Sequence, residues 1–185
     1  MIKAFDTPRL HIRGLIPEDW IALQAIIWQY NASDFASYDR EWPSEPEELK
    51  RVTEWLAHEF AAVAVCLRED GEMIGFIMVD PDHSSSEEAF NLGFIFDYRR
   101  QGQGYATEAG RAVLRKAFTE WGAQRFMSGT AAVNRRAVKL LERLGFEKIG
   151  ESTCSFRNGP DGKPILFTGW NYRLTFDQWG RSEPI

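Results

Sequence analysis

A strand-like run that passes through a glycine-containing turn into a helical pattern is the feature that most constrains this fold. Residues 94–96 are Phe-Ile-Phe, residues 97–104 read D-Y-R-R-Q-G-Q-G, and a helical pattern begins near Tyr105. Because Gly102 and Gly104 have no Cβ, the backbone there can take positive φ and bring its N–H groups close to a ligand. The first turn of the helix leaves N–H groups unpaired at the positive end of its dipole. Together these features predict a phosphate site, although an ordinary tight bend accounts for the same glycines when this stretch is taken alone.

The rest of the chain alternates between strand and helix patterns within one domain. Strands are predicted where short apolar or alternating runs lie between turn residues, at about 10–13, 63–67, 74–79, 90–96, 125–131, 147–156 and 170–176. Helices are predicted where apolar residues recur at helical spacing, at about 17–28, 44–60, 105–121 and 134–144. The order β-α-α-β-β-β-α-β-α-β-β predicts an α+β (mixed α/β) fold in a single domain over residues 1–185, with a frayed tail at 179–185.

Composition and charge exclude several classes of function. The chain has 185 residues, 44% of them hydrophobic, which is enough for one buried core. Its net charge of −5 argues against a nucleic-acid binder, because such proteins usually carry a basic face. With no apolar run near the ~18 residues that span a bilayer and no signal-peptide core, we expect a cytoplasmic protein that is not in a membrane. Cys66 and Cys154 lack CxxC spacing and are expected to be buried, reduced thiols, and the scattered histidines predict no metal site.

Two segments give the chain a resemblance to a known family. Residues 101–109, Q-G-Q-G-Y-A-T-E-A, match a Q/R-x-x-G-x-G/A signature and its continuation, and residues 134–146 begin with Asn134 and end in L-G-F. On these residues the chain resembles the GNAT superfamily of acyl-CoA-dependent N-acetyltransferases, and more closely its branch related to ribosomal-protein N-terminal acetyltransferases. The signature can begin at Arg99 or at Gln101, and we prefer Gln101 because only that register aligns the Y-A-T-E-A continuation. Both registers use the same two glycines.

The resemblance implies a fold and a cofactor site. The fold is a three-layer α/β/α arrangement with a central mixed, largely antiparallel, splayed sheet of about seven strands and four helices. Acetyl-CoA is the implied co-substrate, with its pyrophosphate on the backbone of the glycine turn and its pantetheine arm on the splayed strand edge. Asn134 would contact this arm, although its position before a helix also indicates a plain helix cap. The implied cofactor-binding residues are Phe94, Ile95, Phe96, Gln101, Gly102, Gln103, Gly104, Tyr105, Ala106 and Asn134.

The chain departs from the family where proton transfer is expected. The Tyr that many members use as an acid falls at Leu141, a Ser of the branch falls at Ala137, and a strand Glu falls at Asn91. Leu141 and Ala137 cannot donate a proton, and Asn91 cannot act as a base at neutral pH. We therefore expect a water-mediated route in which Asn91 orients the amine or the water and Glu88 is a distant base. A solvated surface carboxylate is the plainer interpretation of Glu88.

The acceptor is the least constrained part of the prediction. Tyr38 and Trp42 lie where family members shape the acceptor pocket, and they are expected to bind substrate unless they are core for the first two helices. The leading hypothesis is direct transfer of an acetyl group, in a ternary complex, to a primary amine of a protein or peptide N-terminus or of a small molecule. The alternative, motivated by the missing acid and base, is a non-catalytic acyl-CoA-binding module used for sensing or partner interaction. A dinucleotide site is disfavoured because Thr107 stands where a third Gly or Ala is needed. Since similar proteins are commonly homodimers, a homodimer is the expected assembly.

Overall fold

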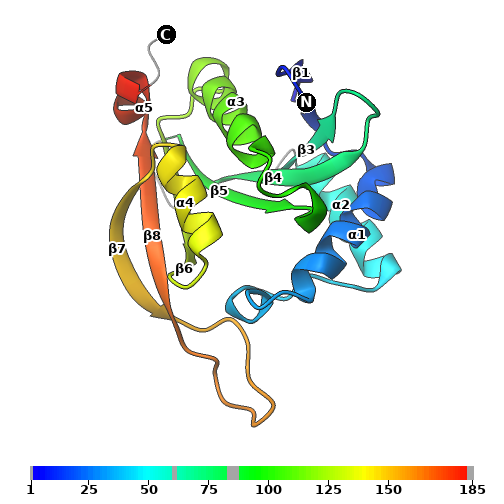
Figure 1. The fold of residues 1–185 in the computed structure, drawn as a ribbon, viewed down its shortest axis with the longest axis vertical. Coiled ribbons are helices and arrows are strands. Elements are labelled where there is room, and N and C mark those ends of the chain that lie inside the picture. Colours follow the sequence, from blue (N-terminus) through cyan, green and yellow to red (C-terminus); the bar gives the residue numbers. More distant parts are fainter. Residues whose placement is uncertain (1, 60–61, 83–87, 183–185) are drawn as a thin grey trace.

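The computed structural model describes residues 2–59, 62–82 and 88–182, which form one sheet with helices on both faces (Figure 1). The strands are β1 (Phe5–Asp6), β2 (Leu10–Gly14), β3 (Ala62–Leu67), β4 (Met73–Pro81), β5 (Ala89–Phe96), β6 (Arg125–Ala131), β7 (Glu147–Cys154) and β8 (Phe167–Thr175). The α-helices are α1 (Trp20–Asn31), α2 (Pro46–His58), α3 (Tyr105–Glu120), α4 (Arg135–Arg143) and α5 (Phe176–Ser182). Short 3-10 helices are η1 (Pro17–Asp19), η2 (Ala36–Tyr38) and η3 (Tyr98–Arg100).

The sheet is mixed, with one parallel pair at its centre. Its order is β1-β2-β3-β4-β5-β6-β8-β7, and β5 with β6 is the parallel pair, while the other neighbours are antiparallel. The predicted class, an α+β fold with a largely antiparallel sheet, is confirmed. Within the described residues there are eight strands and five α-helices, against the predicted seven and four.

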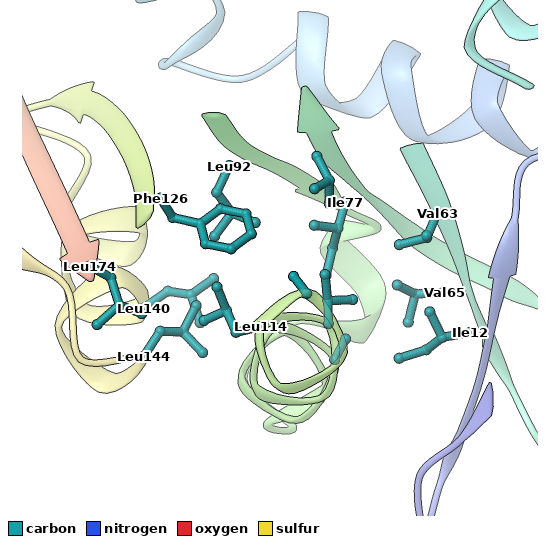
Figure 2. Packing of buried hydrophobic residues seen from close by; sticks show 14 of the residues in the cluster. Ile12, Val63, Val65, Ile77, Leu92, Leu114, Phe126, Leu140, Leu144 and Leu174 are labelled. Carbon is teal, nitrogen blue, oxygen red and sulfur yellow. The ribbon is translucent and has the colours of Figure 1, made fainter. Parts of the chain in front are cut away.

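The sheet separates two apolar cores, and its central strands contribute to both. All six residues of β3 are buried, and they alternate between the two cores. This alternation follows from the period of two in a strand that is covered on both faces. Side chains from the strands, from α3 and from α4 meet in the first core, as Figure 2 shows, whereas α1 and α2 cover the second.

Helices α3 and α4 approach each other closely beside the parallel pair. Gly110 of α3 permits this approach, because a Cβ there would lie 2.9 Å from the side chain of Leu144, which follows α4. The first residues of both helices line one cavity, which is described below. The packing of α3 on α4 therefore helps to set the distance between the two helix N-termini.

Most predicted elements are present, and the differences lie at the chain ends. The predicted strand at 125–131 coincides with β6, but β1 and α5 were not predicted. The predicted fraying is wrong for residues 179–182, because Phe176 begins α5 and Trp179 is only 4% exposed and stacks on Phe118 at 5.3 Å. Residues 183–185 of the predicted tail, and Phe60 of the second predicted helix, lie outside the described residues.

Both cysteines are free thiols. Cys66 is buried, as predicted, and burial raises the pKa of its thiol. Cys154 is partly exposed, so the prediction that it is buried is wrong. In the described ranges, no helix is long and apolar enough to cross a membrane.

Candidate functional site

The predicted strand-turn-helix segment forms a turn whose backbone is shaped by two glycines. Asp97 follows β5 and accepts a hydrogen bond from the backbone N–H of Arg99 at 2.8 Å, which starts η3. Gly102 and Gly104 have φ values of +77° and +84°, in the left-handed region that favours glycine. Since Gly104 directly precedes α3 and has no side chain, the first turn of this 16-residue helix has no side-chain cap. The turn thus presents unpaired N–H donors at the positive end of a long helix.

A hydrogen-bonded cluster supports this turn through contacts with Gln103 and Tyr105. It consists of Thr7, Arg9 and Glu108, and we call it the Arg9–Glu108 clamp. Glu108 accepts from Thr7 Oγ1 at 2.6 Å and from Arg9 Nε at 2.7 Å. Arg9 Nη1 donates to the carbonyl oxygen of Gln103 at 2.9 Å, and its guanidinium carbon lies 4.4 Å from the centroid of the Tyr105 ring. Burial alone would raise the pKa of Glu108, but the hydrogen bonds from Thr7 and Arg9 outweigh it and lower the pKa. The N-terminal segment therefore fixes the turn through an ionised carboxylate.

Strands β5 and β6 separate beyond Asn91, as predicted. Their parallel pairing covers residues 89–91 and 125–127. Beyond it, the carbonyl of Leu92 accepts from Ser128 Oγ at 2.8 Å, and that of Phe96 accepts from Gln101 Nε2 at 3.3 Å. Because alternate residues present their backbone groups at the same strand edge, Phe94 turns its N–H and C=O to this opening as well. The opening can therefore pair with an extended ligand that supplies one donor and one acceptor.

A cavity of about 540 Å³ connects the turn, the open edge of β5 and the start of α4. Asn134 caps α4, because its Oδ1 accepts from the backbone N–H of Ala137 at 3.2 Å, and it also lines the cavity. Arg136 Nη1 donates to Gln101 Oε1 at 2.8 Å and ties α4 to the turn. The lining residues that come from outside the turn and β5 include Tyr30, Phe35, Asn134, Arg136, Ala137, Leu140 and Arg143.

The structure brings together all of the predicted cofactor-binding residues except Gln103. The other nine line this one cavity, which is consistent with the prediction without testing it. Gln103 instead uses its carbonyl to accept from Arg9, and its side-chain amide donates to the carbonyl of Arg99 at 3.5 Å. We conclude that Gln103 stabilises the conformation of the turn and does not line the cavity.

Basic side chains line the cavity near the glycine turn. Arg100, Arg136 and Arg143 contribute to its wall, and the described partner of Arg136 is the neutral amide of Gln101. Arg100 pairs with Glu72, and this hydrogen bond raises the pKa of its guanidinium. A polyanionic ligand is therefore attracted to the same end at which the helix donors lie.

Two aromatic side chains of the cavity wall come from the helical layer. Tyr30, in the last turn of α1, and Phe35, just after it, line the cavity together with β5. The Tyr30 hydroxyl donates to Asp39 Oδ2 at 2.8 Å. Burial and then the negative charge of Asp39 raise the pKa of Tyr30, so this hydroxyl stays protonated. Sequence patterns had not identified Tyr30, Phe35 or Asp39, and the polar, aromatic character of residues 31–43 is the signal that could have drawn attention to them.

The predicted proton-transfer residues Asn91 and Glu88 are not at this cavity. Asn91 is exposed in the part of β5 that is still paired on both sides, where its neighbours are Asp80 and Met127. Glu88 is exposed before β5 begins, and its carbonyl accepts from the backbone N–H of Gln124 at 2.8 Å. The geometry therefore gives no support to the roles predicted for them.

The two positions where the family carries an acid also lack one in three dimensions. Ala137 lines the cavity with a methyl group, and Leu141 is fully buried in the first core. Any group that moves a proton must therefore come from elsewhere on the cavity wall. Within the described residues, no group of three or more His, Cys, Asp or Glu could hold a metal ion.

The predicted substrate residues Tyr38 and Trp42 belong to the packing around the cavity and do not line it. Trp42 packs edge-on against Phe76 with ring centroids 5.5 Å apart, in the second core. Tyr38 contacts Phe167 of β8 with ring centroids 5.3 Å apart. The core interpretation therefore fits Trp42, whereas Tyr38 joins the helical layer to the last hairpin.

Comparison with known proteins agrees with this architecture. Residues 9–147 of the 185 match the acetyltransferase (GNAT) domain family, and the chain belongs to that family. It is therefore an acetyltransferase, and acetyltransferases of this fold use acetyl-CoA. The matched range contains Arg9 and Glu108 of the clamp, the turn, the open edge of β5 and α4.

Individual relatives are more distant. The chain is 26% identical over 145 residues to the uncharacterized N-acetyltransferase YnaD of Bacillus subtilis, covering 78% of this chain and 82% of that protein. The crystal structure of ribosomal-protein-S5-alanine acetyltransferase from Vibrio fischeri has a TM-score of 0.78 at 18% identity, covering 96% and 99% of the two chains. Spermidine N-acetyltransferase from Vibrio cholerae, in complex with CoA and spermine, has a TM-score of 0.74 at 17% identity, covering 94% and 99%. At these identities the two structures show the shared fold.

Proposed function

We propose that the protein transfers an acetyl group from acetyl-CoA to a primary amine by direct transfer in a ternary complex. The observation that carries this proposal is the single cavity lined by the glycine turn, the open edge of β5, the start of α4, and Tyr30 and Phe35. It combines helix N–H donors with basic side chains, a free strand edge, and an aromatic wall from the helical layer. Two substrates held side by side in such a cavity react without a covalent enzyme intermediate, because positioning supplies much of the rate.

The residues present fit acetyl-CoA. The unpaired N–H donors in the first turn of α3, with Arg136 and Arg143 on the same cavity wall, suit a pyrophosphate. The edge of β5 at Phe94 suits the amides of a pantetheine arm, and the same edge can polarise a carbonyl that is held against it. When bound, the cofactor supplies an activated acetyl thioester, and the protein supplies position and proton transfer.

The class of acceptor is taken from chemistry and from the relatives' names. A ribosomal-protein alanine and spermidine are the acceptors named for two proteins of this fold, and both are primary amines. We propose a primary amine for this chain as well, on a protein or peptide N-terminus or on a small molecule. Peptides with N-terminal alanine or serine and linear polyamines therefore form the first panel of acceptors.

The test separates binding from transfer. Acetyl-CoA at about 100 times its dissociation constant should stabilise the protein by about 2.7 kcal/mol, which is read out as a rise in melting temperature. Release of free CoA thiol that depends on the acceptor should follow with at least one member of the panel. No stabilisation by millimolar acetyl-CoA would refute the proposal, whereas stabilisation without acceptor-dependent thiol release across the panel would favour the non-catalytic binding module.

A further inference from the structure

Tyr30 lines the cavity from the last turn of α1, and two hydrogen bonds hold that turn in place. Its backbone carbonyl accepts from Ser33 Oγ at 2.6 Å, which closes the end of α1. The neighbouring Gln29 accepts through Oε1 from the backbone N–H of Tyr98 at 2.9 Å, which ties the same helical turn to η3. Tyr30 is thereby fixed relative to β5 and the glycine turn, although it comes from the opposite layer of the fold.

The direction of its hydrogen bond makes this hydroxyl suited to proton transfer. Tyr30 donates its proton to Asp39 Oδ2 at 2.8 Å, so its oxygen can still accept a hydrogen bond from a group in the cavity. Asp39 is held in turn, because Oδ1 accepts from the backbone N–H of Arg40 at 2.7 Å and its carbonyl accepts from Arg157 Nε at 2.9 Å. The charged and titratable groups facing Tyr30 are Asp39, Tyr98 and Arg157.

Other tyrosines of the cavity lack this arrangement. Tyr98 and Tyr105 also line it, but in the described part of the chain only the hydroxyl of Tyr30 donates to a carboxylate. The ring of Tyr105 is engaged by Arg9 in the clamp. Ala137 and Leu141 cannot carry protons, whereas Tyr30 lines the cavity and its hydroxyl is backed by the carboxylate of Asp39.

We propose that Tyr30 is a catalytic residue that takes the proton from the attacking amine while passing its own proton to Asp39. This inference rests on the proposed function and assigns its missing base. Tyr30 would touch the amine, and Asp39 is a positioning residue that acts through Tyr30. Because Tyr30 stays protonated at neutral pH, it serves as a relay that gives and receives a proton together.

The step balances as follows. The lone pair of a neutral amine forms the C–N bond with the thioester carbonyl, and the C–S bond breaks so that CoA leaves as a thiolate. One N–H proton of the amine moves to Tyr30 Oη, and the original proton of Tyr30 moves to Asp39 Oδ2. The thiolate takes a proton from solvent, and Asp39 returns its proton to solvent, which restores both residues.

The test compares Tyr30→Phe and Asp39→Asn with the unchanged protein, using acetyl-CoA with alanine-terminated peptide and spermidine as acceptors. General base catalysis contributes about 10²–10⁴-fold, so kcat should fall by at least about 100-fold in Tyr30→Phe. The binding of acetyl-CoA, followed by melting temperature, should change less than about twofold in affinity, because the ring remains and the phosphate end is unaltered. Tyr172→Phe is the matched control, since Tyr172 is buried in the first core, away from Asp39 and outside the cavity lining, and its kcat should stay within about twofold.

The pH profile distinguishes proton relay from mere support of the wall. Hydroxide can replace the relay at high pH, so the deficit of both variants should narrow as pH rises. A deficit that is the same at every pH, or a Tyr30→Phe variant within about threefold of the unchanged protein, would overturn the relay while leaving the proposed function intact. If the unchanged protein releases no thiol with any acceptor, both the proposed function and the relay fail.

Discussion

Replacement of Glu108 by Gln is the most direct way to ask whether the clamp shapes the phosphate site. The carboxylate accepts three hydrogen bonds, from Thr7 Oγ1 and the backbone N–H of Arg9 at Oε1 and from Arg9 Nε at Oε2, and it forms an ion pair with Arg9 Nη2 at 2.6 Å. Gln keeps the shape but removes the charge and turns an amide donor toward Arg9. Arg9 would then lose the partner that aims its Nη1 at the carbonyl of Gln103.

The expected loss of folding stability in Glu108→Gln lies between the loss for a surface ion pair and the loss for a buried one. The side chain of Glu108 is 17% exposed and that of Arg9 is 46% exposed. Breaking a buried pair costs about 3–5 kcal/mol and an exposed pair typically below about 1 kcal/mol, so we expect about 2 kcal/mol here. For a chain of this length that lowers the melting temperature by about 4–8 °C. Without the clamp, the turn must also be ordered when acetyl-CoA binds. If that ordering costs about 1.4 kcal/mol, the variant binds acetyl-CoA about tenfold more weakly.

The effect should also depend on pH in one direction. The pKa of Glu108 is lowered from the 4.5 of an unperturbed Glu, so its stabilising contribution is present above pH 4.5. It is lost as pH falls below 4.5 through the folded-state pKa. The difference in melting temperature between the variant and the unchanged protein should therefore narrow below that pH.

Differential scanning fluorimetry across pH, with and without acetyl-CoA, measures the melting temperature, its dependence on pH and the affinity for acetyl-CoA. Glu120→Gln is the matched control, because Glu120 also lies in α3 and pairs with Lys116 at 2.5 Å, but its side chain is 55% exposed. If Glu108→Gln destabilised the protein no more than Glu120→Gln, the argument for the clamp would be wrong. A loss of stability with unchanged affinity for acetyl-CoA would show that the clamp supports the fold but not the turn.

Two further substitutions test other parts of the argument. Gly104→Val should abolish most of the stabilisation by acetyl-CoA, because a β-branched residue is strained at φ +84° and its Cβ would lie 3.4 Å from Arg9; unchanged affinity in calorimetry would contradict the backbone contact. Trp179→Ala should destabilise the protein by about 3 kcal/mol in urea unfolding, since Trp179 is buried against Phe118, and a variant as stable as the unchanged protein would mean that α5 does not support the core.

The central helices and the glycine turn could be predicted from the sequence because residues close by in the chain determine them. The glycine turn, the cap at Asn134 and the apolar periods of α3 and α4 each depend on residues within one or two helical turns. β1 has only two residues and no period of its own, and it exists because it pairs with β2. α5 was missed because the alternation of β8 continues through Phe176, whose burial against Phe118 and Trp179 favours a helix instead.

The candidate site was predictable on one side only, for the same reason. The glycine turn is a contiguous segment, so spacing alone indicated that it forms a turn at the start of α3. The wall around Tyr30 depends on contacts between segments far apart in the sequence, such as that of Arg157 with the backbone carbonyl of Asp39. A local pattern does not show which aromatic side chain faces the cavity once these contacts form. Trp42 and Tyr38 looked equivalent to Tyr30 in the sequence, but Phe76 and Phe167 engage their rings in packing.

This division bears on how acceptor choice can vary within the fold. The last hairpin reaches the helical layer through Arg157, which donates to the carbonyls of Asp39 at 2.9 Å and Arg40 at 3.3 Å. Residues 155–166 of that hairpin and residues 32–45 between α1 and α2 are connecting segments outside the main sheet, so they can change without disturbing the glycine turn or the open edge of β5. Because Asp39 lies where these two segments meet, we expect a change in either one to alter both the cavity wall at Phe35 and the position of the carboxylate behind Tyr30. If Tyr30 relays the proton as proposed, acceptor choice and proton transfer are therefore coupled, and substitutions in these segments should change both of them more than they change the affinity for acetyl-CoA.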